Sequence, residues 1–560
     1  MSSVGAAPQT AAPGFFDRET IVAKAGFNRW LVPPAALAIH LCIGMAYGFS
    51  VFWVPLGRAV AAARGLPKPI ACPGDATSFS GKLAITGHAL FAVDCDWTQF
   101  DLGWMYTLFF VFLGSSAAIW GGWLEREGPR KAGAVAACCW AGGLVIAALG
   151  VYIHQLWLMW LGAGVIGGVG LGLGYISPVS TLVKWFPDRR GMATGMAIMG
   201  FGGGAMIGSP LASLLMNHFK TATDVGVWQT LLVLAAVYFV FMMGGALGYR
   251  LPPAHWAPEG FTFTRRAGAM IAHGNVHLKD AHKTPQFWLV WLVLTLNVSA
   301  GIGVIGAAAP MLQETFGGHL FGHPSVGFAQ FTDEDRKLAG AVAAGFVGLF
   351  SLFNILGRFF WASLSDHIGR KTTYYCFFVL GIVCYGTLTT LANWGLLPVF
   401  AGFCCIIASM YGGGFATVPA YLADLFGVQY VGAIHGRLLT AWSTAGIVGP
   451  VLVNYLHDSR VAGGVPRDHV YDAIFYALTG LLVVGLVCNA LVRPVAEKWF
   501  IKTTPSEHEP HAAAAPPRAT SHGIGYGGFD AEAAVAWALV GVPLAWGVYM
   551  TLLSAAKIFL

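Results

Sequence analysis

Thirteen long apolar stretches alternate with shorter polar segments along the chain. Most reach about 20 residues, the length an α-helix needs to cross a bilayer, and none alternates strictly as the strands of a membrane barrel do. They therefore predict an all-α integral membrane protein. The expected spans are Leu31–Leu56, Leu102–Leu124, Ala132–Ile153, Leu156–Leu182, Gly191–Met216, Trp228–Tyr249, Phe287–Leu312, Leu338–Leu364, Thr373–Trp394, Leu396–Leu422, Gly432–Tyr455, Ala473–Leu491 and Ala533–Ala555.

The polar segments between these spans predict how the chain is divided. The expected parts are a cytoplasmic N-terminal segment (1–28), an N-terminal six-helix half (29–249), a cytoplasmic connector (250–286), a C-terminal six-helix half (287–492), a flexible cytoplasmic linker (493–530) and an extra transmembrane helix (531–560).

A short turn occurs twice and shows that the two halves are duplicates. GGWLEREGPRK ends at Lys131 and ASLSDHIGRK ends at Lys371, and the acidic residues Glu125 and Asp366 are 366 − 125 = 241 positions apart. Other landmarks keep an offset of 240 or 241, namely Pro178 with Pro419, Phe186 with Phe426 and Pro210 with Pro450. Parallel repeats of this kind are common in secondary transporters.

Composition excludes a water-soluble globule, because apolar residues make up 56% of the chain and charged residues only 10%, against about 25% charged in soluble domains. We interpret the net charge of +6 as basic residues that orient the loops across the membrane, not as a surface that binds nucleic acid. Roughly twice as many Lys and Arg fall on the side of the amino terminus as on the other side, which places that terminus in the cytoplasm of a multi-pass protein of the inner (plasma) membrane.

The spans contain no clustered nucleophile, metal set or paired acids, so we expect no enzyme, no cofactor and no metal site. Cys72 and Cys95 share the first external loop. An oxidising compartment allows a disulfide there, but two free thiols remain an equal alternative.

In both copies of the turn, glycine permits a tight reversal and basic residues hold it at the cytoplasmic face. The acidic residue can cap a helix or pair with a cation across the bundle. A conformational latch and a plain hairpin turn with topology-setting charges are the two interpretations, and the duplication favours the latch. The residues of this predicted latch are Glu125, Arg126, Gly128, Arg130, Asp366, Gly369 and Arg370.

These turns resemble the signature loops of the major facilitator superfamily. WFPDRRGMATG (Trp185–Gly195), YGFSVFWVPL (Tyr47–Leu56) and LGRFFWASLSDHIGRK (Leu356–Lys371) resemble the oxalate/formate antiporter family, which is related to the monocarboxylate transporters. The resemblance covers roughly residues 28–495 and implies a twelve-helix fold of two six-helix halves. The last span resembles a small single-helix subunit that some members have as a separate chain.

Arg358 is the main candidate for binding cargo. It lies two turns before Asp366, about 12 Å inside the cytoplasmic end of its helix, and no Asp or Glu falls within the twelve core spans to pair with it. A buried, unpaired guanidinium is suited to a carboxylate from outside, and the resemblance places a substrate-binding arginine here. The alternatives are an arginine that snorkels to the cytoplasm or one that binds backbone carbonyls.

The surrounding positions refine the expected cargo. The resemblance aligns Trp442 with a lysine of oxalate-binding members, so one fixed cation favours a monocarboxylate over oxalate. Asn354, one turn before Arg358, stands where proton-coupled monocarboxylate transporters have an aspartate. His40 is interpreted as the remaining titratable residue within the core spans, with a role in binding a proton or the cargo. The alternative is a histidine that only packs against its neighbours. Tyr47, Tyr175, Tyr411 and Trp442 lie mid-span, where they either line a cavity around Arg358 or merely pack.

The sequence thus predicts a monomeric transporter of small carboxylates in the formate, lactate or oxalate class, working in the bilayer by alternating access, as an antiporter or linked to protons. A transporter of sugars or drugs and a non-transporting membrane sensor are the alternatives. No nucleic-acid partner is expected.

Overall fold

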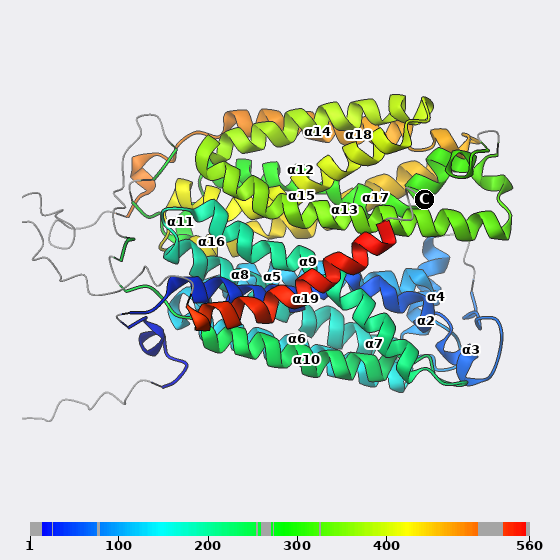
Figure 1. Ribbon diagram of the computed structural model, residues 1–560, viewed down its shortest axis with the longest axis horizontal. Coiled ribbons are helices and arrows are strands. Elements are labelled where there is room, and N and C mark those ends of the chain that lie inside the picture. Colours follow the sequence, from blue (N-terminus) through cyan, green and yellow to red (C-terminus); the bar gives the residue numbers. More distant parts are fainter. Residues whose placement is uncertain are drawn as a thin grey trace, which may run out of the picture.

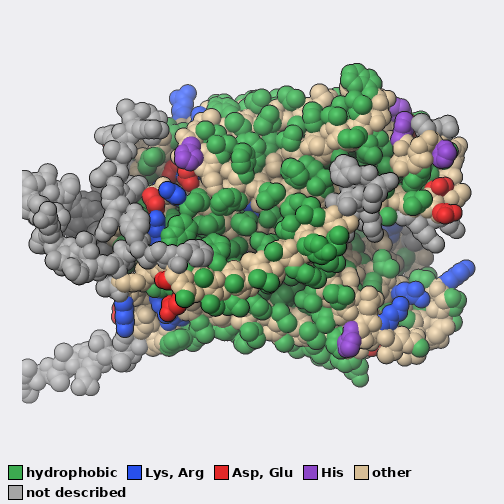
Figure 2. Space-filling view, in the orientation of Figure 1, with side chains coloured by type: hydrophobic (Ala, Val, Ile, Leu, Met, Phe, Trp, Pro, Cys, Tyr) green, Lys and Arg blue, Asp and Glu red, His purple; other side chains and the backbone are tan. Residues whose placement is uncertain are grey.

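A computed structural model describes residues 14–24, 26–74, 79–253, 256–258, 270–272, 274–323, 326–501 and 530–555. Within these ranges the regular elements are helices, and the β-structure is limited to two isolated bridges, Val22 with Leu251 and Val276 with Phe500. Thirteen helical segments of the described ranges are long and apolar enough to cross a membrane. Hydrophobic side chains cover the middle of the face in Figure 2, and charged side chains gather toward the two ends.

The N-terminal half holds the first six spanning segments. The helices of this half are α1 (Val32–Ile43) continued by a 3-10 segment (Gly44–Phe52) and α2 (Trp53–Leu56), α5 (Gln99–Glu127), α6 (Pro129–Tyr152), α7 (Leu156–Met159) continued by a π-helical segment (Trp160–Gly167) and α8 (Gly168–Trp185), α9 (Arg190–Phe219) and α10 (Val227–Gly248). The short α3 (Ala59–Ala63) and α4 (Phe79–Ala89) lie between the first two spans.

The C-terminal half repeats this order after the short α11 (Leu278–Ala281). Its helices are α12 (Pro285–Phe316), α13 (Asp333–Ile368), α14 (Arg370–Asn393), α15 (Leu397–Phe426), α16 (Val431–Leu438) followed directly by α17 (Thr440–Ala462), and α18 (Asp472–Leu491). The two helices that lead into the duplicated turns begin alike, because a capping box forms at Thr98 and Asp101 in α5 and at Thr332 and Asp335 in α13.

The duplicated turns lie at one end of the bundle, here called the turn end. Gly128 and Gly369, between the helices of each turn, have φ values of 96° and 88°, a region that side chains with a Cβ rarely adopt. The reversal after each acidic residue therefore needs glycine in both copies.

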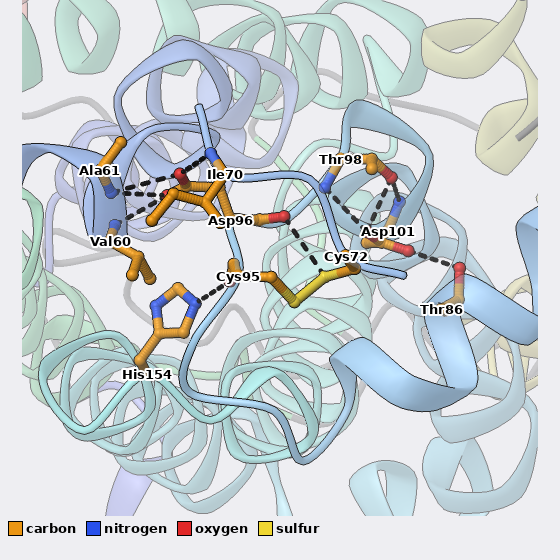
Figure 3. Close-up of a disulfide and its surroundings, with 10 residues drawn as sticks. All are labelled: Val60, Ala61, Ile70, Cys72, Thr86, Cys95, Asp96, Thr98, Asp101 and His154. Carbon is orange, nitrogen blue, oxygen red and sulfur yellow. Dashed lines mark hydrogen bonds between the residues drawn. A yellow bond between two sulfur atoms is a disulfide. The ribbon is translucent and has the colours of Figure 1, made fainter. Parts of the chain in front are cut away.

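The opposite end, here called the disulfide end, is held by a covalent bond and a buried carboxylate (Figure 3). Cys72 and Cys95 form a disulfide, which settles the alternative that the sequence left open. The carboxylate of Asp96 accepts hydrogen bonds from the amides of Val60 (2.7 Å) and Ile70 (2.8 Å), and His154 Nε2 lies 2.8 Å from the carbonyl oxygen of Cys95. The long loop of the first half is thereby fixed at this end.

The halves meet along two equivalent pairs of helices. α9 of the first half packs on α13 of the second, and α16 and α17 of the second pack on α5 of the first. Small residues allow the close approach. A Cβ on Gly195 of α9 would lie 2.9 Å from the carbonyl oxygen of Arg358 in α13, and one on Gly436 of α16 would lie 2.2 Å from that of Ala117 in α5.

The thirteenth helix, α19 (Ala531–Ala555), runs obliquely across the face where the halves meet (red in Figure 1). It contacts α1 and α9 of the first half and α13 of the second. Trp537 Nε1 donates to the carbonyl oxygen of Trp30 at 3.2 Å. A Cβ on Gly203 of α9 would lie 2.9 Å from Leu544, and one on Gly348 of α13 would lie 3.1 Å from Thr551. α19 therefore packs on both halves at once.

Candidate functional site

Arg358 of α13 is fully buried between the two halves. Its Nε donates to Asn354 Oδ1 at 3.1 Å, and its Nη1 donates to the carbonyl oxygen of Ile198 in α9 at 3.3 Å. The rings of Phe201 and Phe415 lie 5.8 and 5.6 Å from its Cζ atom, one from each half. Aromatic faces and carbonyl oxygens partly compensate a buried cation, so the guanidinium is held where the halves meet.

Arg358 forms no salt bridge with any residue that the structure describes. Its Nη2 has no acceptor in hydrogen-bonding geometry among them, and the Tyr47 and Tyr175 hydroxyls lie beside the guanidinium. The predicted spans hold no Asp or Glu, but the helices are longer than these spans and do contain carboxylates. Among them are Glu314 of α12 and Asp424 of α15. Glu314 binds His457 and Arg467, and Asp424 binds Arg190 and Arg370.

Glycines on two helices make room for this side chain. A Cβ on Gly202 of α9 would lie 3.0 Å from Arg358 Nε, and one on Gly412 of α15 would lie 3.0 Å from Arg358 Cγ and 2.7 Å from Asn354 Oδ1. Both glycines belong to runs, GFGGG and YGGGF, inside apolar helices. The runs thus leave space for the Arg358 side chain between α9 and α15.

The four predicted aromatic residues gather around the guanidinium. Trp442 lies 5.4 Å from Tyr175 and 6.4 Å from Tyr47 between ring centroids, and the hydroxyl oxygens of Tyr47 and Tyr411 are 3.1 Å apart across the two halves. His40 lies 5.2 Å from Tyr175. With Asn354, the structure brings all seven predicted binding residues into one region.

Several donors of this cluster have no acceptor among the described residues. They are Arg358 Nη2, the Tyr175 hydroxyl and Trp442 Nε1, and all three residues are buried. Buried donors are normally paired. An incoming carboxylate would supply the acceptor oxygens that this cluster lacks.

Sequence reasoning missed Phe201, Phe415 and His435. The duplication points to the first two, because Phe201 corresponds to Trp442 (442 − 201 = 241) and Phe415 to Tyr175 (415 − 175 = 240). His435 lies inside the predicted span Gly432–Tyr455, so the criterion that selected His40 also selects His435. Its ring centroid is 5.9 Å from that of Tyr175.

At the turn end, each acidic residue of the duplicated turn reaches the other half. Glu125 of α5 accepts from Ser180 (2.8 Å), from Lys184 (2.6 Å) and from the amide of Gly432 in α16 (3.1 Å). Gly432 is at the start of α16, where amides lack intrahelical partners. The first carboxylate therefore joins α5 to the opposite half.

Asp366 makes the equivalent contact with more bonds. Its two carboxylate oxygens accept from the amides of Gly191 and Met192, each at 2.8 Å, at the start of α9. Arg370 Nη2 lies 2.5 Å from Asp366 Oδ1, and Asp424 bridges Arg370 (3.3 Å) to Arg190 of the first half (3.1 Å).

Two residues of the predicted latch stand outside this network. Arg130 donates to the carbonyl oxygens of Phe15 and Tyr249 rather than to Glu125, and Arg126 is exposed. Gly128 and Gly369 supply the positive φ of each turn.

One group of side chains has the spacing of a metal site. His88, Asp94 and Cys95 place their ligand atoms within 4.8 Å of one another, but the Cys95 sulfur is already bound in the disulfide. Within the described part of the chain this trio therefore does not offer three ligands.

Comparison with known proteins agrees with this architecture. The Major Facilitator Superfamily family model matches residues 36–332 and 296–559. The oxalate:formate antiporter of Oxalobacter formigenes is 25% identical over 62% of this chain and 73% of its own length. Human monocarboxylate transporter 11 is 25% identical over 64% of this chain and 69% of its own length. The crystal structure of the E. coli fucose:proton symporter superimposes with a TM-score of 0.54 at 12% identity, over 83% of this chain and all of that one.

Proposed function

This chain belongs to the major facilitator superfamily, and we propose that it carries small organic carboxylate anions of the formate, lactate or oxalate class across the membrane. The observation that carries the proposal is the buried Arg358, which has no carboxylate partner among the described residues and a free Nη2 between the two halves. A guanidinium so placed gains most from a carboxylate that arrives with the cargo. The names of the relatives, an oxalate:formate antiporter and a monocarboxylate transporter, support the same class.

The binding site consists of Arg358 and the residues that surround it. Arg358 holds the carboxylate, and Asn354 orients the guanidinium through its 3.1 Å bond to Nε. Trp442 and Tyr175 donate to the remaining oxygens, and Tyr47 and Tyr411 close the site on the side of the disulfide end through their shared hydroxyl contact. Only one fixed cation is present in this group, so a monocarboxylate fits better than oxalate.

Transport follows from alternating access, in which the halves rock about the bound anion. Bonds between Glu125 and α16 and between Asp366 and α9 act as a latch that holds the turn end closed. The excess of basic residues supports a cytoplasmic location for this end and for the amino terminus, and we assign the protein to the plasma membrane as part of this proposal.

Coupling is by anion exchange, or by a proton that travels on the cargo. Asn354 is an amide that does not titrate, so the position next to Arg358 offers no carboxylate for a proton relay. Binding of the anion neutralises the guanidinium and lowers the cost of closing the site around it. An empty carrier returns slowly, which makes exchange faster than net transport.

Counterflow into proteoliposomes tests this function. Labelled formate, lactate and oxalate are presented in turn to the wild type, to Arg358→Gln and to the charge control Arg64→Gln in the exposed external loop. We expect the wild type to accumulate at least one acid and the control to match it. Loss of a buried, charge-assisted contact of about 3 kcal/mol predicts that Arg358→Gln loses about a hundredfold in exchange. Exchange that survives this change, or a wild type that moves none of the three acids, would overturn the proposal.

A further inference from the structure

A second group of buried polar side chains lies between Arg358 and the turn end. Tyr175 of α8 is flanked by His40 of α1, at 5.2 Å, and by His435 of α16, at 5.9 Å, between ring centroids. All three side chains are fully buried. His435 is three residues from Gly432, whose amide binds Glu125 in the predicted latch.

Polar atoms of this group are left without acceptors or donors among the described residues. Both ring nitrogens of His435 form no hydrogen bond. The Tyr175 hydroxyl lies beside the Arg358 guanidinium, which can only donate to it, so its own hydrogen has no acceptor. The two histidines differ, because the carbonyl oxygens of Tyr175 and Ala197 lie near the His40 ring. Nothing comparable faces His435, so its nitrogens are the more completely unpaired.

Packing alone does not account for a histidine here. Each buried, unsatisfied polar atom costs on the order of 1–3 kcal/mol, whereas a leucine or phenylalanine would fill similar space without that cost. The helix itself does not require the side chain, because the adjacent residues Ile434 and Gly436 are apolar or small. An imidazole in this place is explained by a polar group that visits it.

We propose that His435 and Tyr175 form a second station for the transported carboxylate, on the turn side of Arg358. The inference rests on the proposed function and adds a binding site to it. One N–H of His435 and the hydroxyl of Tyr175 donate to the two carboxylate oxygens, from opposite halves of the protein. The stations adjoin, because Tyr175 packs on Trp442 at 5.4 Å.

The place of His435 on α16 ties this station to the opening of the turn end. α16 carries the bond from Gly432 to Glu125 at its start and His435 one turn later. When the halves part at the turn end, α16 moves away from α5 and α8, and the anion leaves Arg358 past a residue that can still hold it. The second station therefore affects binding from the turn side more than from the disulfide side.

Transport from each side separately tests this asymmetry. Right-side-out and inside-out membrane vesicles are assayed with labelled formate, lactate and oxalate, using His435→Leu, His435→Met and His435→Gln. Tyr175→Phe is added as a variant that removes a donor from both stations and should therefore weaken binding from both sides. We expect His435→Leu and His435→Met to raise the half-saturation concentration about tenfold from the turn side, as for one lost hydrogen bond to a charged group, and less than about twofold from the other side. His435→Gln keeps an N–H donor and should stay within about threefold of the wild type.

His218→Leu is the matched control, because His218 is an exposed histidine at the far end of α9; it should leave both half-saturation values unchanged. Equal effects from the two sides, or wild-type values for His435→Leu, would overturn the second station while the primary one at Arg358 stands. If His435→Leu does not fold, His435→Met, whose unbranched side chain also lacks an N–H donor, decides the question. A wild type that moves none of the acids removes both proposals together.

Discussion

The two copies of the duplicated turn have the same backbone geometry but unequal bonding. Both reverse at a glycine with positive φ, and both place a carboxylate at the start of a helix in the opposite half. The first copy makes one bond across the halves, from Gly432 to Glu125, whereas Asp366 accepts two, from Gly191 and Met192. Duplication thus preserved the position of the contact but not its strength.

The difference comes from the residues around each carboxylate. Lys184 in the first half corresponds to Asp424 in the second (424 − 184 = 240), and Arg190 corresponds to Val431 (431 − 190 = 241). Lys184 pairs with Glu125 inside its own half. Asp424 instead links Arg370 to Arg190 across the halves. We therefore expect the second copy to resist opening of the turn end more strongly than the first.

Of the changes that test this difference, Asp366→Asn should weaken the closed turn end most. The change removes the charge that two amides and Arg370 share, at a cost of about 3 kcal/mol for a partly buried network. Hydrogen exchange of the amides at the start of α9, followed by mass spectrometry, should become about a hundredfold faster. The amides at the start of α16 serve as the internal reference.

If hydrogen exchange at the starts of α9 and α16 becomes faster by the same factor in Asp366→Asn, the second copy does not hold the turn end more strongly than the first. A purified variant that keeps its size-exclusion profile but shows slow exchange at Gly191 and Met192 would contradict the proposed latch directly.

Removing α19 should have an intermediate effect. This helix packs on α9 and α13, the same two helices that the Asp366 bonds join. It should therefore strengthen the contact made by the second copy of the turn and leave the contact made by the first copy unchanged. A chain that ends after residue 529 should show about tenfold faster exchange at the start of α9 and little change at α16, for a loss of about 1.4 kcal/mol.

Co-expressing residues 530–560 as a separate chain is the control, since a helix that docks in the same place should restore slow exchange. A truncated protein with wild-type exchange at both helix starts would show that α19 does not brace the halves.

The sequence predicted the spans and the duplication well because both follow from hydrophobic length and spacing. It placed Arg358, Asn354 and four aromatic residues in one region, since each lies mid-span in a helix that lines the interface. Side-chain partners were harder to predict. Arg130 repeats Arg370 in position, yet it binds the carbonyl oxygens of Phe15 and Tyr249, because the N-terminal segment and the end of α10 lie beside it.

Local irregularities within the helices could not be predicted from the hydrophobic pattern either. The first span changes to a 3-10 segment at Gly44, where a Cβ would lie 2.3 Å from the carbonyl oxygen of Phe201 in α9. The eleventh span breaks between α16 and α17 at Leu439. Hydrophobic periodicity carries no information on either feature, because the apolar pattern continues unchanged through both.

Glu125→Gln should have the smallest effect of the three changes. The amide oxygen of glutamine can still accept from Gly432, so the variant loses mainly the charge that attracts Lys184. We expect hydrogen exchange to become about fivefold faster at the start of α16, corresponding to about 1 kcal/mol, and to stay unchanged at the start of α9. Arg130→Gln is the matched control, because Arg130 occupies the position of Arg370 without touching Glu125. If Arg130→Gln speeds up hydrogen exchange at the start of α16 as much as Glu125→Gln does, Arg130 supports Glu125 as Arg370 supports Asp366. The two turns would then not differ in their bonding.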